Sequence, residues 1–223
     1  MSDRLVDDFS ALSGWSAVTS GQARLHLATE TAAAGPALRL DFDFKGSGGF
    51  VVARKAFALR LPDAFRFTFR LRGEAPANGF EFKLVDASGH NVWRYTEVPG
   101  DFPGAWRTVR LNSSRIPFAW GPQGGGELRD LGAIEFVIAA GPGGAGTLWL
   151  ADLRLEDRSL PAAPAVSASC ALPGHSAECL FDGHADTCWR CPPSDTSPWL
   201  LLDLQRECEV GGLIVHWTPD SAP

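Results

Sequence analysis

Apolar residues alternate with polar residues over long stretches of the first 160 positions. The clearest stretch is 65–72, where phenylalanine and leucine alternate with arginine and threonine (FRFTFRLR). Successive side chains of a strand point to opposite faces, so this period of two predicts an antiparallel strand with one buried face and one polar face. A helix with an apolar face would need a period of 3.6, which this part of the sequence lacks. The alternation therefore predicts a sheet and argues against a helical fold.

Glycine, proline, asparagine and aspartate interrupt the alternation about every 8–12 residues, the spacing of short strands joined by turns. We expect strands near residues 4–9, 23–29, 38–44, 49–57, 65–71, 80–84, 91–96, 105–111, 132–140 and 146–156. The connections are too short for crossover helices, so the strands suit two packed antiparallel sheets. The predicted fold class is all-β, an antiparallel β-sandwich of the jelly-roll type.

Charge and cysteine content divide the chain near residue 160. Residues 1–160 hold 18 Lys+Arg and 18 Asp+Glu, whereas residues 161–223 hold 2 and 8, so the formal charge of −6 belongs to the second part. All of the cysteines lie after residue 169 (Cys170, Cys179, Cys188, Cys191 and Cys208). We therefore expect a first domain over 1–158, a Pro/Ala linker over 159–166 and a second domain over 167–223.

Composition also excludes several classes of partner. A neutral first domain and an acidic second one lack the clustered cations that nucleic acid binding requires. No apolar run reaches the about 18 residues of a membrane span, and the start MSDRLVDDF lacks the apolar core of a secretion signal. The sequence predicts no nucleic acid partner and no membrane span. Taken as written it indicates a cytoplasmic chain, although its compartment stays open.

Polar faces of the expected strands combine planar donors, carboxylates and aromatic rings. Sugar rings present C–H faces to aromatic rings, and Asp, Glu and Arg side chains bridge their hydroxyls, so these are the parts of a carbohydrate site. The candidate ligand-binding residues are Arg54, Arg70, Glu81, Lys83, Trp93, Arg94, Tyr95 and Trp120. Two alternatives stay open: either Arg94 or the pair Trp93 and Tyr95 shares a face with these charges. Aromatic residues of a sandwich belong more often to its core than to a binding platform.

Several motifs in the first part resemble the galactose-binding-like jelly rolls, in particular family 11-type carbohydrate-binding modules and the complex I intermediate-associated protein domains. They are LVDDF at 5–9, GGF at 48–50, FKLVD at 82–86, WRTV at 106–109 and GTLWLADLRL at 146–155. In such modules a structural calcium ion often links the first and last strands. The resemblance implies Asp8 and Asp152 as its ligands, since Ca²⁺ prefers carboxylate oxygens. The alternative is that both residues only cap turns.

A second resemblance covers the tail. LFDGHADTCWR at 180–190, WLLLDL at 199–204 and VGGLIVHW at 210–217 resemble the start of a coagulation factor 5/8 type C (discoidin) domain, a family that includes family 32-type carbohydrate-binding modules. The resemblance implies a calcium loop with Asp182, Asp186 and Thr187 as ligands. Only about half of such a domain is present, so we expect an incomplete second β-sandwich. Its unpaired strands and apolar face would be disordered, rearranged or docked.

The cysteines allow three interpretations. The first is a zinc site, because Cys188-x-x-Cys191 and the cysteines and histidines near it are ligand types that zinc prefers. Only one Cys-x-x-Cys pair is present, however, whereas a four-cysteine zinc ribbon usually has two. Disulfides such as Cys170 with Cys179 are the second interpretation. The odd count and the missing secretion signal favour the third, which is reduced thiols.

Function follows from the resemblances more than from any single motif. The leading hypothesis is a non-catalytic carbohydrate-binding region of a larger carbohydrate-active protein, such as a glycoside hydrolase with a downstream catalytic domain. One alternative is a protein-interaction or assembly domain like the complex I intermediate-associated proteins. Another is a β-sandwich hydrolase or lyase whose candidate carboxylates are Asp41, Glu81, Asp86 and Glu135, although no nucleophile motif or distinct carboxylate pair stands out.

Overall fold

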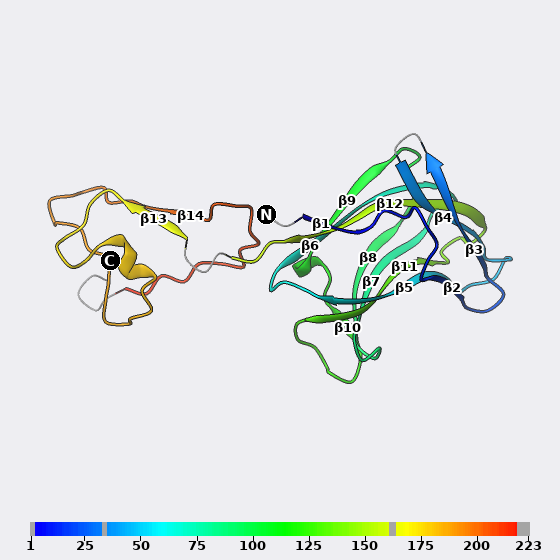
Figure 1. Cartoon of the computed structure of the whole chain (residues 1–223), viewed down its shortest axis with the longest axis horizontal. Coiled ribbons are helices and arrows are strands. Elements are labelled where there is room, and N and C mark those ends of the chain that lie inside the picture. Colours follow the sequence, from blue (N-terminus) through cyan, green and yellow to red (C-terminus); the bar gives the residue numbers. More distant parts are fainter. Residues whose placement is uncertain (1–2, 33–34, 161–163, 218–223) are drawn as a thin grey trace. The chain divides into compact units, whose positions relative to one another are not determined.

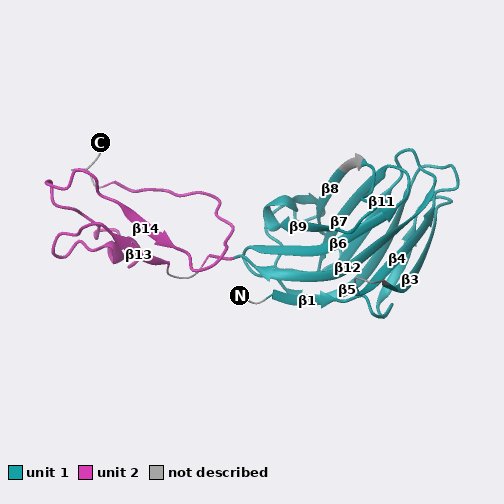
Figure 2. Cartoon of the chain, turned by 90° about the horizontal axis from the view of Figure 1, so that it is seen from above, with its two compact units in different colours: residues 1–158 teal, residues 159–223 magenta. Residues whose placement is uncertain are grey.

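Strands dominate the first of two compact units into which the chain divides, residues 1–158 and residues 159–223 (Figure 2). The computed structural model describes residues 3–32, 35–160 and 164–217. The strands of the first unit are β1 (Asp3–Asp7), β2 (Trp15–Thr19), β3 (Arg24–Ala32), β4 (Gly35–Asp43), β5 (Phe50–Arg60), β6 (Phe65–Glu74), β7 (Asn78–Asp86), β8 (Val92–Gly100), β9 (Arg107–Asn112), β10 (Phe118–Trp120), β11 (Asp130–Ala139) and β12 (Ala145–Asp157). A short 3₁₀ turn, η1 (Ser113–Arg115), precedes β10.

These strands form two antiparallel sheets (Figure 1). The first sheet has the order β3-β4-β12-β6-β9, with β1 also paired to β12. The second has the order β10-β8-β7-β11-β5-β2. The predicted all-β class and antiparallel jelly-roll sandwich are confirmed. Sequence analysis missed β2 and β10, because both are too short to show a clear alternation.

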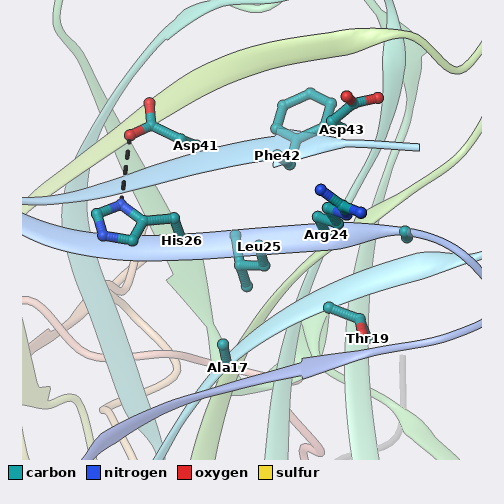
Figure 3. Close-up of a pocket in the computed structure, with 9 residues that line it drawn as sticks. Ala17, Thr19, Arg24, Leu25, His26, Asp41, Phe42 and Asp43 are labelled. Atoms are coloured by element: carbon teal, nitrogen blue, oxygen red, sulfur yellow. Dashed lines mark ion pairs between the residues drawn. The ribbon is translucent and has the colours of Figure 1, made fainter. Parts of the chain in front are cut away.

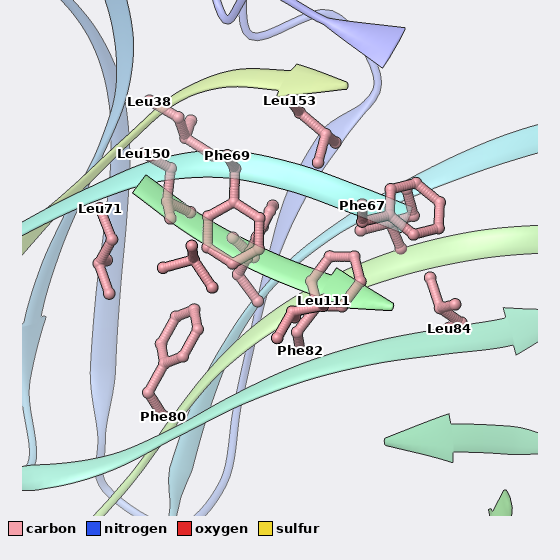
Figure 4. Close-up of a cluster of buried hydrophobic side chains, with 14 of the residues drawn as sticks. Leu38, Phe67, Phe69, Leu71, Phe80, Phe82, Leu84, Leu111, Leu150 and Leu153 are labelled. Carbon is pink, nitrogen blue, oxygen red and sulfur yellow. The ribbon is translucent and has the colours of Figure 1, made fainter. Parts of the chain in front are cut away.

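The two sheets face each other across a core of aromatic and aliphatic side chains (Figure 4). Phe69 of β6 comes from the first sheet, and Phe82 of β7 and Phe136 of β11 come from the second. The ring of Phe136 lies 5.2 Å from that of Phe69 and 5.3 Å from that of Phe82. All three side chains are fully buried. This contact between sheets determines which face of each strand points inward.

The second unit has little regular structure. Strand β13 (Ala165–Ala168) pairs with β14 (Leu200–Asp203), and a 3₁₀ turn, η2 (Ala177–Leu180), lies between them in sequence. Of the expected linker 159–166, residues 161–163 lie outside the described part, and the last two residues already belong to β13. Apolar side chains such as Leu213, Ile214 and Trp217 are exposed here. None of the helices in the described residues is long and apolar enough to cross a membrane.

A disulfide joins Cys170 to Cys191, so the expectation of reduced cysteines is wrong for this pair, and the alternative partner Cys179 is free. The local backbone explains the pairing. Leu172 N donates to the carbonyl of Arg190 at 2.8 Å, which brings the two cysteine segments side by side with 5.4 Å between the cysteine Cα atoms. That separation suits a disulfide. It also removes Cys191 from the Cys-x-x-Cys pair of the zinc interpretation.

Alkylation tests the pairing. In denaturant without reductant, mass spectrometry is expected to find three labelled cysteines, Cys179, Cys188 and Cys208, and reduction should expose Cys170 and Cys191 as well. Cys191→Ser should destabilise the second unit by about 3 kcal/mol, because the disulfide closes a loop of about 20 residues. Cys208→Ser is the control with no expected effect on the loop. Labelling of all five cysteines before reduction would contradict the pairing.

Candidate functional site

A row of polar side chains crosses five strands on the outer face of the second sheet. Each member lies directly opposite the next in the strand pairing, in the order Ser16, Arg54, Glu135, Lys83 and Arg94. Their sequence neighbours, such as Phe82 and Phe136, point into the core. The row is therefore a direct consequence of the alternation, since the buried positions fix the outward ones.

The two carboxylates in and beside this row, Glu135 and Glu81, are paired with cations. Glu135 pairs with Arg54. Glu81, two residues before Lys83 on β7, is 3.0 Å from Lys83 Nζ and 3.2 Å from Arg94 Nη1. The Glu81 and Glu135 side chains are only 13% and 15% exposed, so these partners compensate for the lost hydration of the carboxylates. The result is an ordered array of donors and acceptors on an open sheet face.

Trp120 supplies an aromatic ring at one edge of this array. Its β10 position lies opposite Val92, and Val85, Val92 and Ala133 form a small buried apolar cluster beside it. Lys83 Nζ and Arg94 Cζ lie 5.2 and 5.5 Å from the centre of the indole ring. Trp120 is nevertheless 45% exposed. An exposed indole beside charged hydrogen-bonding groups can contact an apolar ligand face while those groups bind its polar edge.

The loop that follows Trp120 is held by a buried asparagine. Asn91 Oδ1 accepts a hydrogen bond from the Gln123 amide at 2.8 Å, and Asn91 Nδ2 donates to Asp86 Oδ2 at 2.7 Å. Gly121 has φ of +139°, and a Cβ there would lie 2.5 Å from Asn91 Oδ1. Only glycine tolerates both the backbone angle and the close approach. This contact positions the end of β10 and, with it, Trp120.

Asp86 anchors this arrangement as an ionised group. Burial raises the pKa of its carboxyl, but hydrogen bonds from Asn91, Ser88 and His90 outweigh burial and lower the pKa to about 2. A carboxyl group with this pKa is not a proton donor near neutral pH. Hydrogen bonds from Thr147 and Arg39 likewise outweigh burial at Asp41, whose pKa is also lowered. Neither aspartate suits the general acid of the hydrolase alternative.

The structure brings together some of the predicted ligand residues and separates others. Arg54, Glu81, Lys83, Arg94 and Trp120 share the outer face of the second sheet. The remaining candidates lie elsewhere, as described next. Of the two alternatives for β8, the structure therefore selects the one in which Arg94 points outward.

Trp93, Tyr95 and Arg70 do not join this face. Trp93 is buried in the core, and Tyr95 packs against the core from the same side, because both alternate with Arg94. Trp93 thus cannot be a stacking platform. Arg70 lies on β6 of the other sheet, where its guanidinium is 5.4 Å from the Trp106 ring. Alternation shows that the Arg70 side chain points outward, but it does not show to which of the two sheets its strand belongs.

The predicted calcium ligands Asp8 and Asp152 are engaged by nearby donors. Ser10 N and Oγ donate to Asp8 at 2.9 and 2.7 Å, and Arg154 Nε donates to Asp152 at 2.8 Å. Among the described residues, the only three gathered His, Cys, Asp or Glu ligand atoms belong to the disulfide cysteines and Asp195. The shared calcium site of Asp8 and Asp152 stays a prediction.

The tail loop is richer in oxygen. Thr187 Oγ1 lies 2.9 and 2.8 Å from the Asp182 carboxylate oxygens, 2.9 Å from the His184 carbonyl and 3.4 Å from the Cys179 carbonyl. Asp186 is exposed in the same loop. Carboxylate, carbonyl and hydroxyl oxygens are the donors that Ca²⁺ prefers, so this loop fits the ion.

Two of the surface hollows of the sandwich border charged side chains of interest here. One, of about 580 Å³, lies over β2, β3 and β4 and includes the ion pair of His26 Nδ1 with Asp41 Oδ2 at 3.7 Å (Figure 3). The other, of about 530 Å³, borders Arg94 and Arg115. Sequence reasoning missed Ser16 and Arg115. Neither is part of a strong alternation, so only the strand pairing and the turn before β10 reveal them.

Comparison with known proteins adds evidence on the fold. The sequence matches no protein-family model and no curated protein. In three dimensions the chain is similar to a family 11 carbohydrate-binding module from Clostridium thermocellum, solved with a β-1,3-1,4-mixed-linked tetrasaccharide: 16% identity, TM-score 0.58, covering 70% of this chain and 95% of the module.

Two further solved structures agree. The family 11 module of the cellulosomal cellulase Lic26A-Cel5E of Clostridium thermocellum is 15% identical, with TM-score 0.56 and the same coverage. A structure described as belonging to carbohydrate-binding modules of the β-sandwich superfamily is 12% identical, with TM-score 0.50, covering 70% of this chain and 62% of that one. At such identities the likeness establishes the jelly-roll fold alone.

Acid unfolding tests the role of Asp86. Its folded pKa of about 2 lies below the ordinary aspartate value of 3.8, so its contribution to stability is complete above about pH 4 and is lost as the pH falls toward 2. The difference in unfolding free energy between wild type and Asp86→Asn should be constant from about pH 5 to 7 and shrink below about pH 4. Asp101→Asn, at an exposed position, is the control. A difference that persists unchanged down to about pH 2 would contradict this role.

Proposed function

We propose that residues 1–158 form a non-catalytic module that binds oligo- or polysaccharide on the outer face of the second sheet. The observation that carries the proposal is the ordered row of paired charges beside exposed Trp120. Carboxylates accept hydrogen bonds from sugar hydroxyls, guanidinium groups donate to them, and an indole packs on the C–H face of a sugar ring. The sandwich fold, shared with family 11 modules, is compatible with this use.

The ion pairs favour binding over chemistry. Arg54 with Glu135, and Glu81 with Lys83 and Arg94, are held before any ligand arrives, so little side-chain ordering is needed on association. Glycoside hydrolysis instead requires one carboxyl group that carries a proton. On this face Glu81 and Glu135 are instead both engaged by cationic side chains.

The wider context extends the proposal. We place this module in a larger carbohydrate-active protein, such as a glycoside hydrolase with a downstream catalytic domain. The second unit is then the N-terminal part of a discoidin-type domain, on the strength of the motifs at 180–190, 199–204 and 210–217. The exposed apolar residues Leu213, Ile214 and Trp217 are consistent with a domain whose packing partner is missing from this chain.

Affinity electrophoresis of the full chain tests the binding face. We expect retardation by at least one polymer in a panel of soluble glucans, xylans, galactans and mannans. Trp120→Ala should bind that polymer at least tenfold more weakly, because the sugar loses the indole it packs on and the polar contacts that the indole shields from water. Trp199→Ala is the matched control, since that indole is similarly exposed, at 53%, but lies in the second unit. Equal losses in both variants would contradict the assigned face, and no retardation by any polymer would refute the proposal.

The second unit is also proposed to hold a structural calcium ion. Asp182 and the carbonyl of His184 each offer an oxygen atom 2.9 Å from the hydroxyl oxygen of Thr187. The exposed Asp186 is available to add a carboxylate. When bound, the ion would cross-link a loop that is otherwise closed only by hydrogen bonds.

Limited proteolysis tests this ion. Adding Ca²⁺ should slow cleavage of the second unit several-fold relative to chelator, because a ligand that binds only the folded loop stabilises it. Asp182→Asn should remove the calcium effect. The control is Asp203→Asn, since Asp203 Oδ1 accepts a hydrogen bond from the Gln205 amide in another turn of the same unit. Identical cleavage with calcium and with chelator in the wild type would overturn the proposal.

A further inference from the structure

The hollow of about 530 Å³ lies where β8 continues past its short partner β10. Strand β10 pairs only with Val92 and Trp93, and the Arg94 amide then donates to the Pro117 carbonyl at 2.9 Å. Arg94 and Thr96 of β8 line one side of the hollow. Arg115, the last residue of η1, and Phe118 of β10 line the other. The hollow thus adjoins the proposed sugar-binding face and shares Arg94 with it.

Two arginines, Arg94 and Arg115, line this hollow, and none of the described residues that line it carries a carboxylate. Arg115 is exposed, and its guanidinium lies over the ring of Tyr95, with 5.2 Å between Arg115 Cζ and the ring centre. Arg94 uses Nη1 to pair with Glu81. A guanidinium has five N–H donors, so both arginines keep donors for a ligand.

The other hollow provides a comparison within the same domain. It also has a cationic lining residue, Arg24, but the lining includes Asp41 and Asp43 as well (Figure 3). Its positive charge therefore meets carboxylates from the protein itself. The hollow at Arg94 and Arg115 has no such internal partner for Arg115, although the whole chain carries a formal charge of −6. Its positive charge is a local feature that favours an anion.

We propose that this hollow is an anion subsite, which takes a carboxylate or sulfate group of an acidic polysaccharide. The inference rests on the proposed function and deepens it by naming the ligand class. Arg94 borders both surfaces, so we expect an acidic polymer that contacts Trp120 to extend past Arg94 into the hollow that Arg115 also lines. Planar guanidinium groups bind such anions with two parallel hydrogen bonds, which an uncharged sugar hydroxyl cannot match.

The test compares polymers that differ only in charge. Polygalacturonate is paired with its methyl-esterified form, and carrageenan with its desulfated form, in affinity electrophoresis of the full chain. We expect the charged member of at least one pair to bind about tenfold more tightly, with weaker binding as salt is raised. The first pair identifies a carboxylate and the second a sulfate as the preferred group.

Variants assign that preference to the hollow. Arg115→Gln should abolish the preference for the charged polymer, whereas Arg115→Lys should keep part of it. Arg110→Gln is the matched control, because Arg110 is an exposed arginine on β9 of the other sheet. Equal binding within both polymer pairs, or equal effects of Arg115→Gln and Arg110→Gln, would overturn the subsite.

Trp120→Ala separates this inference from the proposed function. If neutral polymers bind through Trp120 but charge brings no advantage, the sugar-binding face stands and the anion subsite falls. If the charged polymers bind through Arg115 and Trp120→Ala has no effect, the anion subsite stands and the sugar-binding face falls. No binding to any of the four polymers overturns the subsite.

Discussion

The pleat of the second sheet links the core of this protein to its proposed binding surface. Phe82 lies opposite Phe136 on the inner face, and one residue along each strand Lys83 lies opposite Glu135 on the outer face. A slip of one residue would bury the charges and expose the rings, which the packing of Phe136 against the first sheet prevents. Burial of the phenylalanines therefore holds the charged row in register, although none of the charges takes part in the core.

Buried residues also position the exposed groups at the edge of the second sheet. Trp93 is a core residue, yet its indole Nε1 donates to the Gly126 carbonyl at 3.0 Å and so fastens the glycine-rich segment that follows β10. Asn91 holds the start of that segment through Gln123. Buried groups on β8 thus position a loop beside an exposed tryptophan, which is how a rigid scaffold makes a precise surface from an irregular segment.

The second unit is stabilised differently. Its sheet has only the strands β13 and β14 in the described residues, and too little apolar surface is buried for a sizeable core. The Cys170–Cys191 disulfide and the hydrogen bonds around Asp182 hold its loops together instead. Small units that lack a large core commonly depend on such cross-links.

Local alternation by itself determined most of the strands, the sandwich and the outward direction of Arg54, Lys83 and Glu81, because the period of two is a property of neighbouring residues. Alternation could not decide whether Arg94 points outward, or Trp93 and Tyr95 do, because either face of this strand would carry a large side chain. Packing of Trp93 against the core settled that question.

Contacts between distant segments were decided only by the tertiary structure. The sequence shows that Arg70 and Lys83 both point outward, but only the strand order places them on different sheets. The disulfide partner of Cys170 and the position of Arg115 beside Arg94 depend in the same way on segments that meet only after folding. Such pairings are set by the packing of the whole chain, which local periodicity does not encode.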